Sequence, residues 1–289
     1  MSLSGRTNTL EKRIFIPKQP LLTEVTDSYY RKQSVLPEIG LFYTFDAAKQ
    51  HRIPLFFPDN TIDIMFSSRE DGSDPHIGIY GQRLRPGTLD VIHPNYRYFG
   101  VRLSPGTRPG LLGMDLSELK EQNLTDADDF VRDRSLLERI IASQNFDDQC
   151  RIFTESFCRF QIEYRDSSQQ NLFYFLQNLI IVSGGTVSVA QMAEQSGYSE
   201  RYIKKIFTQK AAIGPKLFSR IIRFQNLIDQ INRNVLTHKK TDFSRCAACL
   251  GFSDQPHMIR EMKNLSGYTP LEYIHHLQRH HYEERLIRL

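Results

Sequence analysis

The sequence lacks an apolar run long enough to cross a membrane. Its nearest candidate, from Phe173 to Val182, is interrupted by Gln177 and Asn178, whereas a spanning helix needs about 20 consecutive apolar residues. The N-terminus has no apolar segment followed by a small-residue cleavage site, so no secretion signal is predicted. We therefore expect a cytoplasmic protein that makes no membrane contact.

Proline and glycine are also few, at 13 and 16 of 289 residues, while 40% of the residues are hydrophobic. This composition excludes a fibrous or intrinsically disordered chain and is typical of a soluble globular protein. The length allows two domains of ordinary size, each with its own hydrophobic core.

The cysteines are too few to complete a zinc motif. They stand at positions 150, 158, 246 and 249. Cys246 and Cys249 have the spacing of half a zinc site, but a second pair of ligands is missing. Cys246 also follows Phe243 at a helical spacing, which predicts a small core residue. We expect four free thiols, no bound metal and no cofactor.

Motifs of the common enzyme classes are absent as well. The chain has no GxSxG, HExxH, P-loop or dinucleotide fingerprint. Metal chemistry in a cupin-like barrel would need clustered ligands, but His51, His76 and His93 are isolated in the sequence. Histidines at 275, 276, 280 and 281 could bind a metal, although their helical spacing favours a solvated tail. We therefore predict that the protein is not an enzyme.

The net charge of +4 conceals an asymmetry between the two halves of the chain. Residues 168–289 contain 16 Lys and Arg against 9 Asp and Glu, whereas residues 1–167 contain 21 against 24. A basic half beside a mildly acidic half indicates one nucleic-acid-binding domain and a second domain with another role.

The first hundred residues favour β-strands. Short runs of apolar, β-branched or aromatic residues alternate with clusters of Pro, Gly, Asn and Asp. The runs are Gly40–Phe45, Ile53–Phe57, Thr61–Phe66, Ile77–Gly81, Leu89–His93 and Tyr98–Leu103. Regularly spaced short strands with turn signals predict a β-sandwich or barrel-like, cupin-like domain.

Helical periodicity begins near residue 115. One predicted helix contains Leu136 and Ile140 on the same face, and the next contains Phe153 and Phe157. These helices either form a dimer contact or pack against their own sheet. The polar segment 165–168 is the best boundary, which gives an α+β protein with domains at 1–166 and 167–289.

A helix-turn-helix pattern occupies about residues 186–210. A short amphipathic helix ends at Ser196 and Gly197, and Ser199 stands where the next helix needs an N-cap. The outer face of that second helix carries three cations and a hydroxyl at positions i, i+3, i+4 and i+7. They are Arg201, Lys204, Lys205 and Thr208. A cationic helix of this kind fits the major groove of DNA, although a solvated charged face is the alternative interpretation.

The same design recurs at about residues 241–265. Phe243–Leu250 forms the short helix, Gly251 the turn, and Ser253 or Asp254 the cap. The outer face of the following helix carries His257, Arg260, Glu261 and Asn264, with Gln255 at its start. Because this face is less basic than the first, we expect it to contribute hydrogen-bond selectivity more than charge.

A helix between the two units begins at Pro215 and is predicted to run to about Asn232. Eighteen helical residues span about 27 Å, and successive major-groove faces on one side of a duplex lie about 34 Å apart. The two units could therefore be held by this linker helix in adjacent grooves.

These patterns resemble the C-terminal DNA-binding domain of the AraC/XylS family of transcription regulators. The strongest stretches are Leu250–Arg260 (LGFSDQPHMIR) and Gly267–Tyr273 (GYTPLEY), supported by Ser196–Ser199 (SGYS) and the linker segment Pro215–Phe224. The resemblance covers about 100 residues. It implies base contacts at Arg201, Lys204 and Lys205 in the first unit and at Gln255, His257 and Arg260 in the second. One departure from the family pattern is Ala212, where glycine is common.

The N-terminal half is similar to the β-rich sensor domains found in one branch of this family. The matching pieces are Phe57–Ile64, Gly81–Gln82 and Phe99–Gly106. The resemblance implies a bacterial transcription regulator, expected to be an activator, that binds double-stranded DNA and contacts RNA polymerase. It further implies that the N-terminal domain binds a small-molecule effector or forms a homodimer. The alternative is a metal- or ligand-binding cupin-like enzyme with an accessory DNA-binding domain.

Overall fold

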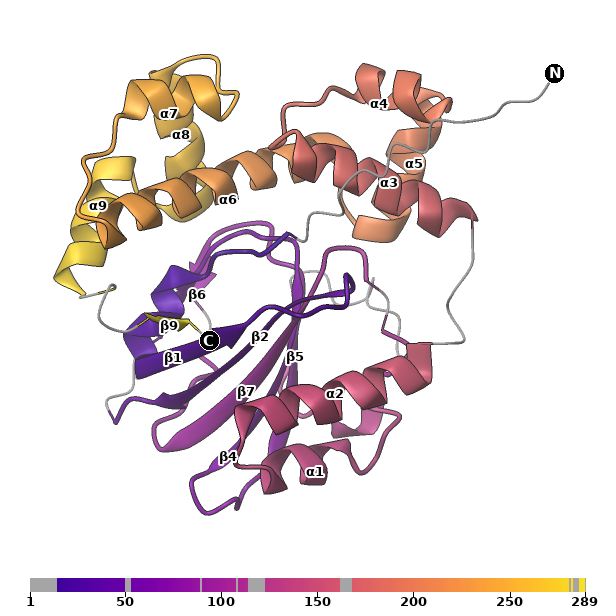
Figure 1. Cartoon of the computed structure of the whole chain (residues 1–289), viewed down its shortest axis with the longest axis vertical. Helices are drawn as coiled ribbons and strands as arrows, with labels where there is room; N and C mark the ends of the chain where they lie inside the picture. Colours follow the sequence, from indigo (N-terminus) through magenta and orange to yellow (C-terminus); the bar gives the residue numbers. More distant parts are fainter. Residues whose placement is uncertain are drawn as a thin grey trace.

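The computed structural model describes residues 15–49, 53–88, 90–107, 109–113, 123–161, 168–280, 282 and 286–288. A sheet-based part and an all-helical part lie one above the other, with the long helix α6 (Pro215–Leu236) running across the top of the sheet (Figure 1). The predicted α+β organisation in two domains is therefore confirmed. None of the described helices is both long and apolar enough to cross a membrane.

The N-terminal part is built on one seven-stranded sheet. In order across the sheet, its strands are β8 (Asn123–Leu124), β5 (His76–Tyr80), β4 (Ile62–Arg69), β7 (Tyr96–Leu103), β2 (Ile39–Ala47), β1 (Thr26–Lys32) and β9 (Leu286–Arg288). Neighbouring strands are antiparallel except for β9, which pairs in parallel with β1. The pair β3 (Leu55–Phe56) and β6 (Gly87–Thr88) forms a separate two-stranded sheet.

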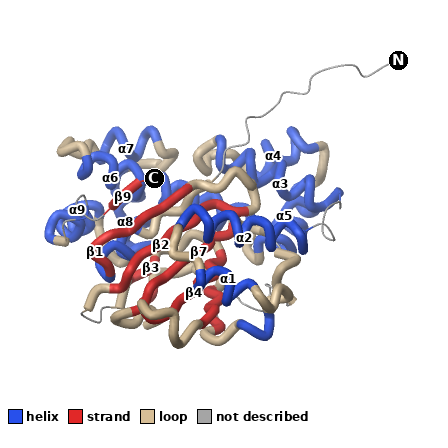
Figure 2. Tube along the Cα trace, turned by 60° about the horizontal axis from the view of Figure 1, so that its bottom comes forward, coloured by secondary structure: helices blue, strands red, loops and turns tan. Residues whose placement is uncertain are grey.

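The two faces of the large sheet are covered differently. One face packs against α1 (Leu136–Ala142) and α2 (Phe146–Gln161), where Phe153 makes edge-on contacts with Phe42 and Phe66. Of the two roles considered for these trailing helices, packing on their own sheet is the one observed (Figure 2). The opposite face is covered by the 3-10 helix η1 (Pro20–Val25) and by residues of the small sheet.

The strand predictions hold for β2, β4, β5 and β7, but the strand expected over Leu89–His93 is wrong. Leu89 lies outside the described residues, and residues 90–93 form no strand. The Tyr98 hydroxyl accepts the N–H of His93 at 2.8 Å and donates to the carbonyl of Val91 at 3.3 Å. A side chain therefore satisfies backbone groups that a strand would have paired. The apolar pattern at Val91 and Ile92 reflects the burial of these side chains in the core and not a strand.

A buried ion pair ties the central strands together. Arg102 in β7 donates through Nε and Nη2 to the two carboxylate oxygens of Asp63 in β4, both at 2.7 Å. Burial alone would lower the pKa of Arg102, but the charge of Asp63 and its hydrogen bonds outweigh burial and raise that pKa well above its ordinary value. Asp59, 4.0 Å from Arg102, accepts a hydrogen bond from Gln19 at 2.6 Å.

The C-terminal part, residues 168–280, consists of helices joined by short loops. Its other helices are α3 (Ser168–Val182), α4 (Val189–Ser196), α5 (Glu200–Ala211), α7 (Phe243–Cys249), α8 (Gln255–Ser266) and α9 (Pro270–Arg279). Helix α6 contributes to two separate cores, one with α3, α4 and α5 and one with α7, α8 and α9. Residues 165–167 of the expected domain boundary lie outside the described residues.

The two parts meet along a seam formed by α6 and α9 above and by η1 and the loop after β3 below. The side chain of Gln225 accepts the N–H of Lys18 at 2.6 Å and donates to the carbonyl of Pro58 at 2.8 Å. The ring of Phe57 packs edge-on against Phe224 and Tyr273, each with ring centroids 5.7 Å apart. Because these groups are buried, the seam is a packed interface.

Candidate nucleic-acid interface

The first helix-turn-helix unit consists of α4 and α5. Ser188 caps α4 in a reciprocal capping box with Gln191, and Gly197 ends it with φ +73°, a conformation that glycine tolerates best. The Ser199 side chain then accepts from the backbone N–H of Tyr202 at the start of α5. The predicted helix, glycine turn and capped second helix are confirmed.

Helix α5 separates an apolar face from a cationic one, as its periodicity predicts. Ile203, Ile206 and Phe207 are fully buried in the first core. The predicted contact residues Arg201, Lys204, Lys205 and Thr208 are all exposed. Lys204 pairs with Glu200 at 3.1 Å. Within the described residues, no salt bridge neutralises Arg201 or Lys205, so both cations remain available for an anionic partner.

At its end, α5 shows the effect of the departure at position 212. Ala212 forms the C-cap with φ +60°. In this left-handed region an L side chain crowds the following carbonyl, at a cost of about 1–2 kcal/mol. The chain therefore makes the same turn that a glycine would make, but with strain.

The second unit consists of α7 and α8. Gly251 adopts φ +73° in the turn, and Asp254, rather than Ser253, caps α8 by accepting from the backbone N–H of His257. Cys246 is buried, as predicted, and burial raises the pKa of its thiol. All four cysteines are free.

The predicted contact residues of α8 differ in accessibility. Arg260 is exposed, and no described residue pairs with it in a salt bridge. Gln255 is half-buried and accepts from the Ser244 hydroxyl at 2.7 Å. His257 is half-buried too, with its Nδ1 3.0 Å from the Ser253 hydroxyl. Of these three side chains, only that of Arg260 is accessible to DNA without first rearranging.

Glu261 does not lie on the outer face of α8, where the periodicity placed it. Its carboxylate accepts two hydrogen bonds from Arg220 of α6, at 2.8 and 3.0 Å, and its side chain is only 14% exposed. Glu261 therefore joins α8 to the linker helix. The helical periodicity of the sequence cannot predict this role, because Arg220 is 41 residues away in the chain.

Helix α6 also holds the first unit. Arg223 donates through Nη1 to the carbonyl of Gly185 at 2.8 Å, and its guanidinium lies 5.9 Å from the ring of Phe252 in the second unit. Gly185 has φ +84°, and a Cβ there would lie 2.4 Å from the carbonyl oxygen of Ser219. Arg220, Arg223 and Gly185 therefore set the relative positions of the two units, a role that the sequence pattern does not indicate.

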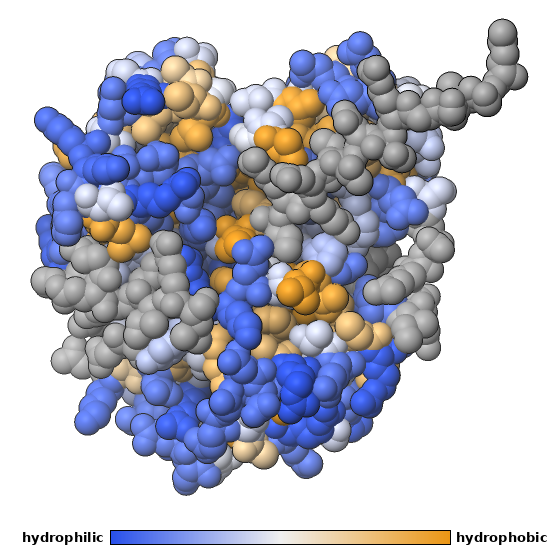
Figure 3. Space-filling view, in the orientation of Figure 1, coloured by the Kyte–Doolittle hydropathy of each residue, from blue (hydrophilic) through white to orange (hydrophobic). Residues whose placement is uncertain are grey.

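The linker helix is longer than predicted. It contains 22 residues instead of about 18, so at about 1.5 Å per residue it spans about 33 Å. This length is close to the spacing of about 34 Å between successive major-groove faces. The space-filling view shows the two units as separate lobes on the upper side of the molecule (Figure 3).

Replacing Gly251 by alanine should destabilise the fold more than replacing Gly197. Both glycines have φ +73°, so either substitution costs about 1–2 kcal/mol of backbone strain. At Gly251, however, the new Cβ would also lie 2.3 Å from Cγ2 of Thr186, and overpacking adds about 1–3 kcal/mol. At Gly197 no atom lies within 4 Å of that position. Urea unfolding of the two variants measures the difference.

Thr186→Ser supplies the rescue for this experiment. It removes the methyl group that the new Cβ would meet, so the double variant Gly251→Ala/Thr186→Ser should recover the steric part of the loss. Equal destabilisation by Gly197→Ala and Gly251→Ala would contradict the close approach of the two units.

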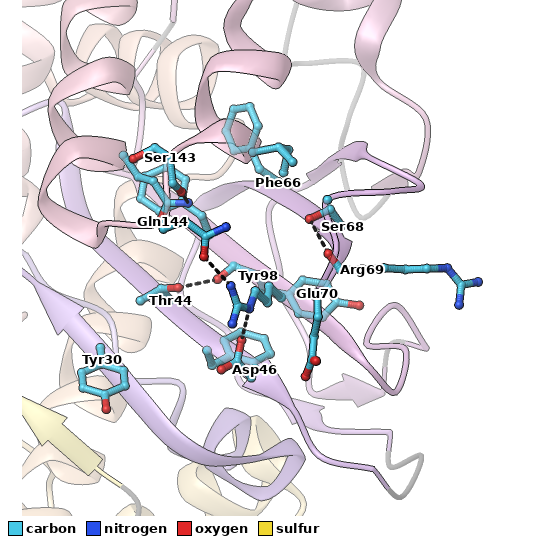
Figure 4. A pocket seen from close by; sticks show the side chains of 16 residues that line it. Tyr30, Thr44, Asp46, Phe66, Ser68, Arg69, Glu70, Tyr98, Ser143 and Gln144 are labelled. Carbon is cyan, nitrogen blue, oxygen red and sulfur yellow. Dashed lines mark hydrogen bonds and ion pairs between the residues drawn. The ribbon is translucent and has the colours of Figure 1, made fainter.

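The N-terminal part contains an open cavity of about 240 Å³ beside the ends of β2, β4 and β7. Its wall combines polar groups with apolar side chains such as Phe66. Arg97 donates to Gln144 at 2.8 Å and pairs with Asp46 at 3.3 Å, and Figure 4 labels both of these partners. Thr44 completes the wall by donating to the carbonyl of Tyr98. This cavity is a candidate for an effector site.

Among the described residues, His76 and His93 belong to no group with the metal-ligand proximity that a cupin-like metal enzyme would need. His76 lies 3.0 Å from Asp74 and 3.3 Å from Asp126, whereas the His93 ring packs edge-on against Tyr96. His51 lies outside the described residues. Among the residues that the structure describes, the one group with metal-ligand proximity is Glu24, His276 and His280.

Comparison with known proteins gives limited similarity. A family model described as "Domain of unknown function (DUF6597)" matches residues 32–125, and no curated protein matches the chain. Similar solved structures include an apo variant of ToxT from Vibrio cholerae strain SCE256, with 12% identity, a TM-score of 0.45, and coverage of 84% of this chain and 99% of that one. A second is wild-type ToxT from the same strain bound to an unsaturated fatty acid, with 12% identity, a TM-score of 0.40, and coverage of 86% and 93%. At such identities and TM-scores, function has to be inferred from the chain's own residues.

Proposed function

We propose that this protein is a sequence-specific, AraC/XylS-type transcription regulator that reads two adjacent major grooves of DNA. One observation carries the proposal: a single 22-residue helix holds two helix-turn-helix units, and the second helix of each unit exposes an arginine. An α-helix fits the major groove, and arginine can donate to both acceptors of a guanine edge. We assign DNA contacts to Arg201, Lys204, Lys205, Thr208, Gln255, His257 and Arg260, with Arg201 and Arg260 as the principal ones.

The N-terminal domain is proposed to control how these units are presented. We place it at residues 1–166 and the DNA-binding domain at 167–289. The cavity near Arg97 is suited to a small polar effector, because its volume is below the about 300–1,000 Å³ of pockets for drug-sized ligands. The hydrogen bonds of Gln225 connect the effector domain directly to the linker helix. Binding of an effector could thus be coupled to the orientation of both units.

The biological setting follows from this assignment. We propose a cytoplasmic activator that contacts RNA polymerase beside its site, and a homodimer where the site is repeated.

Genomic footprinting of the tagged protein tests the proposal. The expected footprint covers two adjacent major grooves on one side of the duplex, because the linker helix matches the groove spacing. A repeated footprint would indicate a dimer. Protection of a single groove, or no sequence preference at all, would contradict the two-unit mechanism.

The salt dependence of DNA binding should separate Lys205 from Lys204. If Lys205 neutralises a phosphate, Lys205→Ala should lower the slope of log affinity against log salt by about 0.9. The change for Lys204→Ala should be smaller, because Glu200 already pairs with this lysine. Fluorescence anisotropy between 50 and 200 mM salt measures both slopes, and Lys49→Ala in the N-terminal domain is the charge-matched control. A slope unchanged in Lys205→Ala would remove this residue from the interface.

A further inference from the structure

Three potential metal ligands meet at the seam between the two parts of the chain. Glu24 lies in η1 of the N-terminal part, His276 in α9, and His280 at the C-cap of α9. One ligand atom from each lies within 4.8 Å of the other two. Glu24 accepts from, or pairs with, Nε2 of His276, and the rings of His276 and His280 have centroids 4.5 Å apart.

The donor set suits a divalent transition metal. Two imidazoles and a carboxylate are ligands that zinc takes at about 2.0–2.2 Å. Atoms no more than 4.8 Å apart lie at most about 2.8 Å from a common centre, so movements below about 1 Å would bring them to coordination distance. The i, i+4 spacing places both histidines on one face of the helix.

The surroundings hold two of these ligands in place. The side chains of Glu24 and His276 are each only 18% exposed, in contrast to the solvated tail that the histidine spacing favoured. The ring of Tyr268 packs 5.1 Å from that of His276 and restricts its orientation. His275, the neighbour in sequence, is exposed and is not part of the group.

We propose that Glu24, His276 and His280 form a binding site for one divalent ion of the zinc class, with a fourth position open to water. The sequence indicates the two histidines as possible ligands but not the carboxylate, because Glu24 is 252 residues from His276. The ion would join η1 to the helix that follows the second helix-turn-helix unit. It would therefore strengthen the seam beside the contact of Phe57 with Tyr273. The binding itself is independent of the proposed function, whereas any consequence for DNA affinity rests on it.

Metal titration of the tag-free full-length protein tests the site without DNA. Isothermal titration with Zn²⁺ should give one ion per chain, and Co²⁺ should give the visible absorption of a four-coordinate site. Changing a residue that only orients a metal ligand costs up to about 100-fold in affinity. Glu24→Gln and His280→Gln remove ligands themselves, so each should weaken binding by at least about 100-fold. His275→Gln, the matched control on the same helix, should bind as the parent protein does.

A structural readout separates a bridging ion from one held by histidines alone. Zinc should slow hydrogen exchange in residues 20–25 of the parent protein, and this protection should be lost in His280→Gln. Circular dichroism confirms that each variant is folded, and Glu24→Gln retains a side chain that can hydrogen-bond to His276. Absence of stoichiometric binding, or equal affinity in Glu24→Gln and His275→Gln, would overturn the site. Neither result would affect the footprint expected from the helix-turn-helix units.

Discussion

Replacing Arg201 and Arg260 together by alanine should reduce specific DNA affinity by roughly 30- to 20,000-fold. An arginine that reads a base contributes about 1–3 kcal/mol, and the two residues lie in separate units with separate cores. Their losses should therefore add, giving about 2–6 kcal/mol at about 1.4 kcal/mol per tenfold change. Fluorescence anisotropy with the footprinted duplex measures the single and double variants.

A control for charge comes from α2 in the N-terminal domain. Arg151→Ala removes the same charge from an exposed helix, where Arg151 pairs with Asp148 and Glu155, and it should leave DNA affinity nearly unchanged. Each single variant should also relax the preference at its own base position. If the double variant binds no more weakly than the weaker single variant, only one unit contacts the duplex and the two-groove proposal fails.

Asp63→Ala should lower the free energy of unfolding of the N-terminal domain by about 3–5 kcal/mol, the usual cost of removing one partner from a buried ion pair. Arg102 is 1% exposed and donates two hydrogen bonds of 2.7 Å to Asp63. Without that carboxylate, the guanidinium would retain Asp59 at 4.0 Å as its remaining acidic neighbour. Urea unfolding followed by circular dichroism measures the loss.

The comparison for this experiment is an exposed pair. Glu155→Ala removes a partner of Arg151 at 3.0 Å on the surface of α2, and surface pairs contribute only about 0–1 kcal/mol. A loss below about 1 kcal/mol for Asp63→Ala would show that the pair does not anchor the central strands. Because the network continues through Asp59 and Gln19 toward Phe57, we also expect faster hydrogen exchange at the seam in Asp63→Ala.

Local chemistry explains why both helix-turn-helix units were predictable. Ser199 can cap a helix with its own hydroxyl, and Gly197 can adopt a positive φ without a Cβ; both effects depend on residues adjacent in sequence. The alternation of Ile203 and Ile206 with exposed cations follows from the 3.6-residue period. Arg201 and Arg260 were placed on exposed surfaces for the same reason.

Strand pairing was less predictable. The polar sequence of β1 carries little apolar alternation, and it becomes a strand because β2 and β9 supply hydrogen-bonding partners. The opposite error occurred at residues 90–93, whose apolar side chains are buried beside Tyr98 without any strand partner. An apolar pattern indicates which side chains are buried, whereas a strand also requires a neighbouring backbone segment to form hydrogen bonds with.

By itself, the sequence determined the positions of the helices, their caps and the glycine turns, because these depend on interactions over a few residues. Only the tertiary structure decided that Glu261 faces Arg220, that Arg223 lies between the two units, and that Glu24 meets His276. These contacts join residues 29 to 252 positions apart, and no local periodicity constrains such distances. The physical reason is that burial and long-range polar pairing are settled when separate elements pack together.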